Sequence, residues 1–183
     1  FQIPREFIGF QDNFKLLYVT HYYPHKNLEI FIELFGRYKK ELANIVVFLT
    51  ISATHDPAAR KLLKKIVQYG LSDNIVNVGP VVHDNLGRYF NNVDALLMPT
   101  LLESFSGSYL EAMYYNVPIL TSDLDFAHEV CGDAALYFDP WDTKSIKDKI
   151  LELKNNSMLS QELVEKGRVQ LQSKFISWNE IAS

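Results

Sequence analysis

Two glutamates, Glu103 and Glu111, flank a loop rich in small residues, with seven residues between them. An ionised carboxylate can accept hydrogen bonds from two neighbouring hydroxyl groups with charge-assisted strength. The loop leads into a segment of helical period that begins at about Gly107. Backbone N–H groups at a helix N-terminus favour an anion. These residue types predict recognition of hydroxyl groups and of an anion by one segment of the chain.

Simpler interpretations of both glutamates stay open at this point. Ser108-x-x-Glu111 also has the spacing of a capping box, in which the glutamate only satisfies backbone groups at a helix N-terminus. Judged alone, the binding role and the capping role of Glu111 are about equally good. Glu103, as an isolated loop glutamate, is more commonly a solvated surface residue.

The candidate cations lie between the first apolar segment and the first amphipathic one, where His21 and Lys26 stand five residues apart. Lys26 can supply a full charge to an anion, although a surface lysine in a first helical turn is commoner. His21 is only partly charged near neutral pH, and a hydrogen-bonded loop histidine is an equally simple interpretation. The segment has neither the Gly-x-Gly-x-x-Gly nor the P-loop pattern, which argues against dinucleotide oxidoreductases and nucleoside triphosphatases.

Six short apolar segments alternate with amphipathic ones along the chain. They cover residues 15–20, 45–51, 74–78, 95–98, 119–122 and 136–138. Such segments are typical of parallel strands that helices cover on both faces. The predicted fold class is α/β, a Rossmann-like, doubly wound parallel sheet of about six strands. Ligands of such sheets bind beyond the carboxyl ends of the strands, so the loops after the strands should carry the chemistry.

Helices are expected over residues 28–42, 57–69, 84–91, 107–115 and 125–130, followed by two or three helices from residue 142 onwards. Asp56 is expected to cap the second helix and Gly70 to end it. The cationic face of that helix is expected to be solvated. Glu129 is either a further wall residue of the site or an exposed helix carboxylate.

The composition restricts the remaining possibilities. With 183 residues, 48% of them hydrophobic, the chain is long enough for one compact domain. The net charge of -4, with dispersed basic residues, argues against a nucleic-acid surface. No apolar segment approaches the roughly 20 residues needed to cross a bilayer as a helix. The single cysteine, Cys131, suggests a buried thiol in a reducing cytoplasm, and the start at Phe1 without a leader pattern suggests an excised fragment.

Several sequence blocks together resemble the retaining glycosyltransferases of family 4 (glycosyl transferases group 1), which have the GT-B fold. The segment from Glu103 to Glu111 resembles the E-x7-E signature of that family. The other similar blocks are Lys26-Asn27-Leu28, Val78-Gly79-Pro80-Val81, Asn116 to Ser122, His128 to Pro140 and Phe175-Ile176-Ser177-Trp178. They follow one another in the order of the family, from about Lys15 to the end. The resemblance implies the C-terminal, donor-binding half of a GT-B enzyme, with residues 15–183 as a nucleotide-sugar-binding domain. Residues 1–14 are then a linker or the start of the domain.

The resemblance also implies roles for individual residues. Glu103 is expected to contact the donor sugar, Glu111 the ribose hydroxyls and Lys26 the diphosphate. Catalysis is expected from Glu103 and Lys26, with no metal and no cofactor. Further contacts to the nucleotide are expected from His21, Ser104, Phe105, Ser106, Gly107 and Val81.

The chain departs from the family pattern around the expected diphosphate site. Thr20-His21 stands where the family usually has a glycine followed by an arginine, and Ser104-Phe105-Ser106 replaces Gly-Phe-Gly. The Cβ atoms of the serines limit how closely a phosphate can approach their backbone. A sugar-nucleotide epimerase, a non-catalytic nucleotide-sugar-binding module and a structural domain with a degenerate site therefore remain as alternatives.

The partners implied by the resemblance are a UDP- or GDP-sugar and an N-terminal acceptor-binding domain that this chain does not contain. Nucleic acid is not an expected partner. The implied process is polysaccharide, lipopolysaccharide or glycolipid synthesis in the cytoplasm. Peripheral association of the complete enzyme with the inner face of the membrane is part of that expectation.

Overall fold

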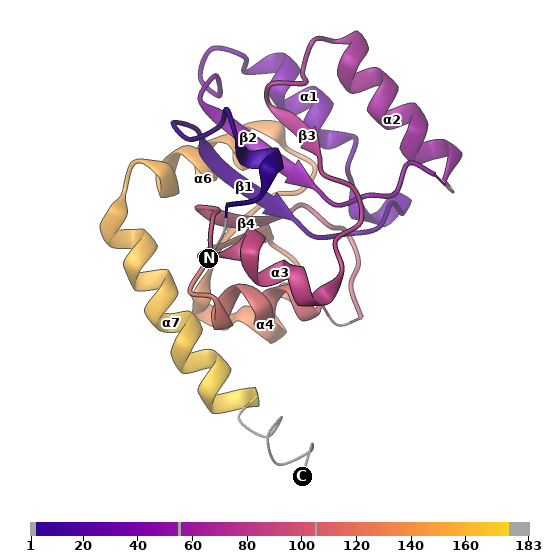
Figure 1. Ribbon diagram of the computed structural model, residues 1–183. Coiled ribbons are helices and arrows are strands. Elements are labelled where there is room, and N and C mark those ends of the chain that lie inside the picture. The colour runs from indigo at the N-terminus through magenta and orange to yellow at the C-terminus, as the bar shows by residue number, and fades with distance from the viewer. Residues whose placement is uncertain (1–2, 55, 105, 176–183) are drawn as a thin grey trace.

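The computed structural model describes residues 3–54, 56–104 and 106–175 (Figure 1). Its centre is a parallel sheet of six strands: β1 (Phe14–Tyr18), β2 (Ile45–Leu49), β3 (Ile75–Asn77), β4 (Ala95–Met98), β5 (Ile119–Ser122) and β6 (Ala135–Phe138). The strand order is β3-β2-β1-β4-β5-β6. This is the order of a doubly wound sheet, so the predicted fold class is confirmed.

Helices cover both faces of the sheet. They are α1 (Ile30–Arg37), α2 (Pro57–Gln68), α3 (His83–Phe90), α4 (Gly107–Tyr114), α5 (Asp125–Cys131), α6 (Thr143–Lys154) and α7 (Ser157–Phe175). Figure 1 shows α1 and α2 on one side of the sheet and α3 and α4 on the other. The C-terminal helices α6 and α7 return across the domain, where α6 packs against α1 and α7 against α4.

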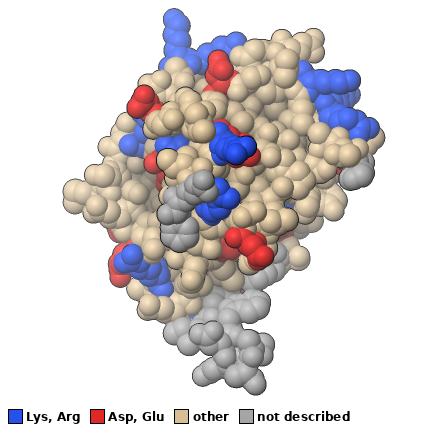
Figure 2. All heavy atoms as spheres, viewed as in Figure 1, with Lys and Arg blue, Asp and Glu red and all other residues tan. Residues whose placement is uncertain are grey.

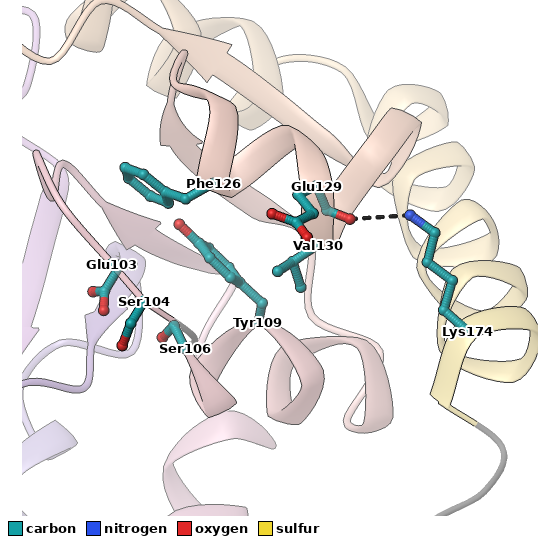
Figure 3. A pocket seen from close by; sticks show the side chains of 8 residues that line it. All are labelled: Glu103, Ser104, Ser106, Tyr109, Phe126, Glu129, Val130 and Lys174. Atoms are coloured by element: carbon teal, nitrogen blue, oxygen red, sulfur yellow. Dashed lines mark hydrogen bonds between the residues drawn. The ribbon is translucent and has the colours of Figure 1, made fainter.

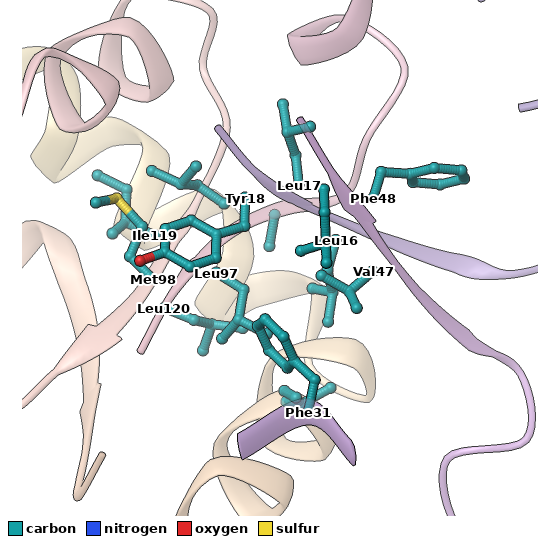
Figure 4. Packing of buried hydrophobic residues seen from close by; sticks show 14 of the residues in the cluster. Leu16, Leu17, Tyr18, Phe31, Val47, Phe48, Leu97, Met98, Ile119 and Leu120 are labelled. Atoms are coloured by element: carbon teal, nitrogen blue, oxygen red, sulfur yellow. The ribbon is translucent and has the colours of Figure 1, made fainter. Parts of the chain in front are cut away.

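The central strands are buried because their sequences are apolar on both faces. All five residues of β2 and all four residues of β4 are buried. Figure 4 shows side chains of four adjacent strands packing together, with Phe31 of α1 beneath them. Near the N-terminus, a 3-10 helix (Arg5–Phe7) adds to this core, because the ring of Phe7 lies 4.1 Å from that of Phe48.

The predicted helix over residues 28–42 is too long. α1 ends at Arg37, after which the chain turns so that the buried Leu42 still reaches the core. The side-chain amide of Asn74 donates to the carbonyl of Leu42 at 3.1 Å, which holds this turn against β3. Glu33 and Arg37, one helical turn apart on α1, form an ion pair at 3.2 Å.

Other local predictions hold. The side chain of Asp56 accepts hydrogen bonds from two backbone N–H groups of α2, and Gly70 has the positive φ of +64° that ends a helix without strain. Three of the four residues of the cationic face, Arg60, Lys61 and Lys64, are exposed, and the fourth, Lys65, is half-buried. Figure 2 shows basic side chains gathered over α2 at the upper right. Cys131 is a buried free thiol.

In the part of the chain that the structure describes, no helix is both long enough and apolar enough to cross a membrane.

Candidate functional site

The sheet has a switch point between β1 and β4. The helix after β1 leads to one face of the sheet and the helix after β4 to the other, so a crevice forms at the carboxyl ends of these two strands. The loop after β1 carries Lys26, and the loop after β4 carries Glu103. The fold therefore brings together two of the residues that the sequence singles out.

Hydrogen bonds between backbone and side chains fix the loop after β1. A 3-10 turn (Pro24–Lys26) ends at Asn27, which has a left-handed conformation with φ +55°. The hydroxyl of Tyr18 donates to the carbonyl of Lys26 at 3.0 Å, and the backbone N–H of Leu101 donates to the carbonyl of His25 at 2.7 Å. The position of Lys26 is thus set by β1 itself and by the loop after β4.

Asn27 adds a second clamp. Its side-chain amide donates to the carbonyl of Pro99 at 3.1 Å and to the carbonyl of Pro140 at 2.8 Å. These carbonyls belong to the loops after β4 and β6. Asparagine suits this position because it tolerates the left-handed backbone and also supplies two amide donors.

Lys26 and Glu103 form an ion pair across the crevice, in which the ammonium group donates to the carboxylate. Both side chains are largely shielded from water, with 16% of Lys26 and 9% of Glu103 exposed. Shielding strengthens the attraction between the charges, but it also penalises either charge when its partner is removed.

The crevice forms a cleft of about 290 Å³. Among the predicted site residues, those that line it are His21, Lys26, Val81, Glu103, Ser106 and Gly107. Thr20, Tyr23, Thr50 and Pro80 also contribute to its walls. The cleft thus extends from the switch point toward the loops after β2 and β3.

The N-terminus of α4 opens into this cleft. Ser106 is the N-cap residue and Gly107 the first helical residue, and the side chain of Ser106 makes no capping hydrogen bond. A Cβ atom added to Gly107 would meet no atom within 4 Å. The first backbone N–H groups of α4 are therefore available to an anion in the cleft.

The capping-box interpretation of Glu111 is wrong. Ser108 lies inside α4 and is buried, two residues too late to act as the N-cap, which is Ser106. The carboxylate of Glu111 instead faces His83 at the start of α3, with 3.5 Å between Oε1 and Nε2. Partial burial raises the pKa of the Glu111 carboxyl group, and the nearby His83 opposes this rise. Glu111 is not among the residues that line the cleft.

A second pocket, of about 400 Å³, lies on the other side of Glu103 (Figure 3). Ser104 lines this pocket, as do Glu103 and Ser106. Its far wall comes from α5, where Phe126 and Glu129 project toward the ring of Tyr109. Glu129 lines the pocket and is also an exposed carboxylate on α5, so both of its interpretations stay open. Phe105 lies outside the described residues.

Sequence reasoning missed several residues around these cavities. Thr50, Tyr109 and Phe126 line them, and Asn27 ties the loops together. Only Asn27 carried a signal, because asparagine is one of the few residues besides glycine that adopt a left-handed backbone. In the part of the chain that the structure describes, no group of His, Cys, Asp or Glu side chains is arranged to hold a metal ion.

Comparison with known proteins assigns the chain to a family. The family model for glycosyl transferases group 1 matches residues 2–170. The chain belongs to this family. It is 30% identical over 128 residues to the O-antigen chain mannosyltransferase RfbU of Salmonella typhimurium, a match covering 70% of this chain and 35% of the relative. It is 30% identical over 100 residues to the capsular polysaccharide biosynthesis glycosyltransferase CapM of Staphylococcus aureus, covering 52% of this chain and 26% of the relative.

Solved structures agree on the fold. Anabaena Alr3699/HepE in complex with UDP-glucose superposes with a TM-score of 0.82 at 15% identity, covering 97% of this chain and 49% of that protein. The C-terminal domain of the group 1 glycosyl transferase LpcC from Francisella tularensis gives a TM-score of 0.74 at 17% identity, covering 93% of this chain and 91% of that domain. The chain thus has the fold of one half of a GT-B glycosyltransferase, and it spans about a quarter to a third of the length of the two curated relatives.

Proposed function

We propose that this chain is the donor-binding part of a retaining glycosyltransferase, which transfers a sugar from a nucleoside diphosphate sugar to an acceptor hydroxyl. The observation that carries the proposal is the shielded Lys26–Glu103 pair beside the open N-terminus of α4 at the switch point. It offers positive potential and a carboxylate within one cleft. A sugar joined to a diphosphate requires both.

The diphosphate binds between Lys26 and the N-terminus of α4 in this proposal. Lys26 supplies a full charge, while Ser106 and Gly107 supply backbone N–H groups. His21, on the wall of the same cleft, adds a weaker contact where the family usually has an arginine. Charge that develops on the departing diphosphate is stabilised by these groups, which the fold holds in place before the reaction.

Glu103 binds hydroxyl groups of the donor sugar once its pairing with Lys26 is broken. In the structure, each partner of this pair satisfies the charge of the other. Donor binding exchanges one ion pair for two new interactions, ammonium with phosphate and carboxylate with sugar hydroxyls. The exchange keeps both shielded charges satisfied throughout.

Glu111 binds the ribose hydroxyls, and Val81 borders the base. The carboxylate of Glu111 lies one helical turn beyond Gly107 on α4, on the side of α3 and His83. A ribose that is joined to the diphosphate and extends away from Lys26 would lie on this side of α4, within reach of Glu111. In this proposal the acceptor hydroxyl attacks the anomeric carbon from the side of the departing diphosphate, which takes up its proton. The configuration is then retained without a protein nucleophile.

The remaining parts of the proposal concern the complete enzyme. The donor is a UDP- or GDP-sugar, and an N-terminal acceptor-binding domain completes the active site. The product belongs to a polysaccharide, lipopolysaccharide or glycolipid, which the names of the curated relatives support. The enzyme acts in the cytoplasm, at the inner face of the membrane.

Titration calorimetry with UDP, GDP and ADP tests the proposal. We expect weak, saturable binding of at least one of them by the 183-residue chain, and little or no sugar transfer by this chain alone. A Lys26→Met variant should lose most of the affinity. No saturable binding at millimolar nucleotide would refute the proposed function.

A further inference from the structure

Two cavities meet at Glu103. The cleft extends from this residue toward β2 and β3, where Thr50 and Val81 form its wall. The second pocket extends in the opposite direction, toward α5, which follows β5. Glu103 and Ser106 line both cavities. Because the strand order is β3-β2-β1-β4-β5-β6, the two cavities form one track along the carboxyl edge of the sheet.

A nucleoside diphosphate sugar is a linear ligand in which base, ribose, diphosphate and sugar follow one another. With the diphosphate between Lys26 and Gly107 and the base near Val81, the sugar ring extends toward β5. We propose that the pocket between α4 and α5 is the subsite for the donor sugar, a neutral hexose, and that Glu129 and Phe126 recognise its ring. This inference rests on the proposed function and adds the residues that select the sugar.

The lining of the pocket has the chemistry that a sugar ring requires. Carboxylates stand at opposite ends, Glu103 after β4 and Glu129 on α5, and each can accept from neighbouring hydroxyls. Between them, the half-buried ring of Phe126 offers an apolar surface to the C–H groups of a sugar, and the buried ring of Tyr109 lies behind this part of the wall (Figure 3). The volume of about 400 Å³ falls within the range of about 300 to 1,000 Å³ that is common for small-ligand pockets.

The two carboxylates have different tasks in this subsite. Glu103 is paired with Lys26 beside the diphosphate, so it reaches hydroxyls near the anomeric carbon. Glu129 lies across the pocket and reaches hydroxyls on the far side of the ring. Sugars that differ in configuration at those distant hydroxyls are thus distinguished by Glu129. An added hydrogen bond to a charged group is a strong source of such selectivity.

Lys174 of α7 supports this wall. Its ammonium group donates to the backbone carbonyl of Glu129 at 3.0 Å, which ties the middle of α5 to α7 (Figure 3). Two carboxylates and one ammonium group line the pocket. A neutral hexose therefore fits this charge balance better than a uronic acid.

The test compares a nucleotide with its sugar conjugate. After UDP, GDP and ADP are ranked by calorimetry, the best of them is titrated against its hexose conjugate, UDP-glucose, GDP-mannose or ADP-glucose. The hexose should increase affinity for the 183-residue chain. Glu129→Gln should reduce this increase about ten-fold, the effect of losing a hydrogen bond to an ionised group, while affinity for the bare nucleotide stays the same.

Two further variants make the result specific. Glu152→Gln changes another exposed helix carboxylate, which pairs with Lys149 on α6, and should leave both affinities unchanged. Phe126→Leu keeps an apolar side chain on α5, where the half-buried Phe126 packs against the core. In the folded variant, the hexose should add less affinity, while affinity for the bare nucleotide stays the same. This second variant keeps the inference testable if Glu129→Gln fails to fold.

The failures of the two proposals are distinguishable. If no nucleotide binds, the proposed function is refuted. If nucleotides bind but the hexose adds no affinity, or its increase survives both Glu129→Gln and Phe126→Leu, the sugar subsite is refuted while the proposed function stands.

Discussion

Replacing Glu103 with glutamine should make the chain bind a nucleoside diphosphate more tightly. The carboxylate of Glu103 pairs with the ammonium group of Lys26 and neutralises its charge. A diphosphate must compete with that carboxylate for the same cation. Glutamine keeps the shape and an oxygen acceptor but removes the negative charge. The variant should therefore gain affinity for the bare nucleotide while losing affinity contributed by the sugar.

The size of the effect follows from the shielding of the pair. Two unit charges about 4 Å apart interact by about 1 kcal/mol in water and about 4 kcal/mol at the effective dielectric constant of roughly 20 near a protein surface. With 16% of Lys26 and 9% of Glu103 exposed, the site lies nearer the second case. Because the amide dipole of glutamine retains part of the attraction, we expect a gain of about 2 kcal/mol, which is about 30-fold in affinity.

Calorimetric titration with UDP, GDP or ADP measures this gain, and the chain offers a matched control. Asp94 pairs with Lys15 at 3.6 Å near the opposite, amino-terminal ends of the same two neighbouring strands. Asp94→Asn makes the same change of charge far from the cleft and should leave nucleotide affinity unaltered. Unchanged or weaker nucleotide binding by Glu103→Gln, in a folded variant, would show that Lys26 does not bind the diphosphate in competition with Glu103.

Three other perturbations test separate parts of the site. Asn27→Ala should lower the free energy of unfolding by about 3 kcal/mol, because alanine is strained at φ +55° and two hydrogen bonds are lost. Asn27→Gly loses the same hydrogen bonds without the strain, so it should lower the free energy of unfolding by only about half as much. Equal losses for the two variants in urea unfolding would contradict this. Gly107→Ala should raise the free energy of unfolding by about 0.5 kcal/mol, because alanine restricts the unfolded chain more than glycine does. It should also weaken nucleotide binding about ten-fold, because the alanine methyl group would occupy the space where the phosphate is proposed to bind. Gly36→Ala, at an equally open helical position, should leave binding unchanged, and a Gly107→Ala variant that binds normally would place the phosphate elsewhere. Because burial raises the pKa of Glu111 and ribose binding needs the ionised carboxylate, nucleotide affinity should fall as pH decreases through that raised pKa. His83→Asn removes the opposing influence and should move the fall to higher pH in titrations of both proteins; coincident pH profiles would count against a role for His83.

The sequence predicted the elements that position the site because their signals are local. The apolar segment over residues 95–98 has the same bounds as β4, and Asp56 and Gly70 mark the ends of α2 as expected. The placement of Lys26 near Glu103 also follows from the sequence, since both lie in loops after strands that a doubly wound sheet makes neighbours.

What the sequence could not predict depends on contacts between distant segments. The capping box failed because α4 begins at Gly107, which leaves Ser108 inside the helix and buried. The clamp by Asn27 requires carbonyl groups 72 and 113 residues further along the chain. The wall formed by Phe126 depends on how α5 packs beside α4, and no local pattern encodes that arrangement.

A crystal structure of the chain with a bound nucleoside diphosphate tests the central claim most directly. We predict that the diphosphate lies between the ammonium group of Lys26 and the N-terminus of α4 at Gly107, with the Lys26–Glu103 pair opened. A nucleotide bound at another surface, or bound here with that pair intact and no contact to Lys26, would contradict the account.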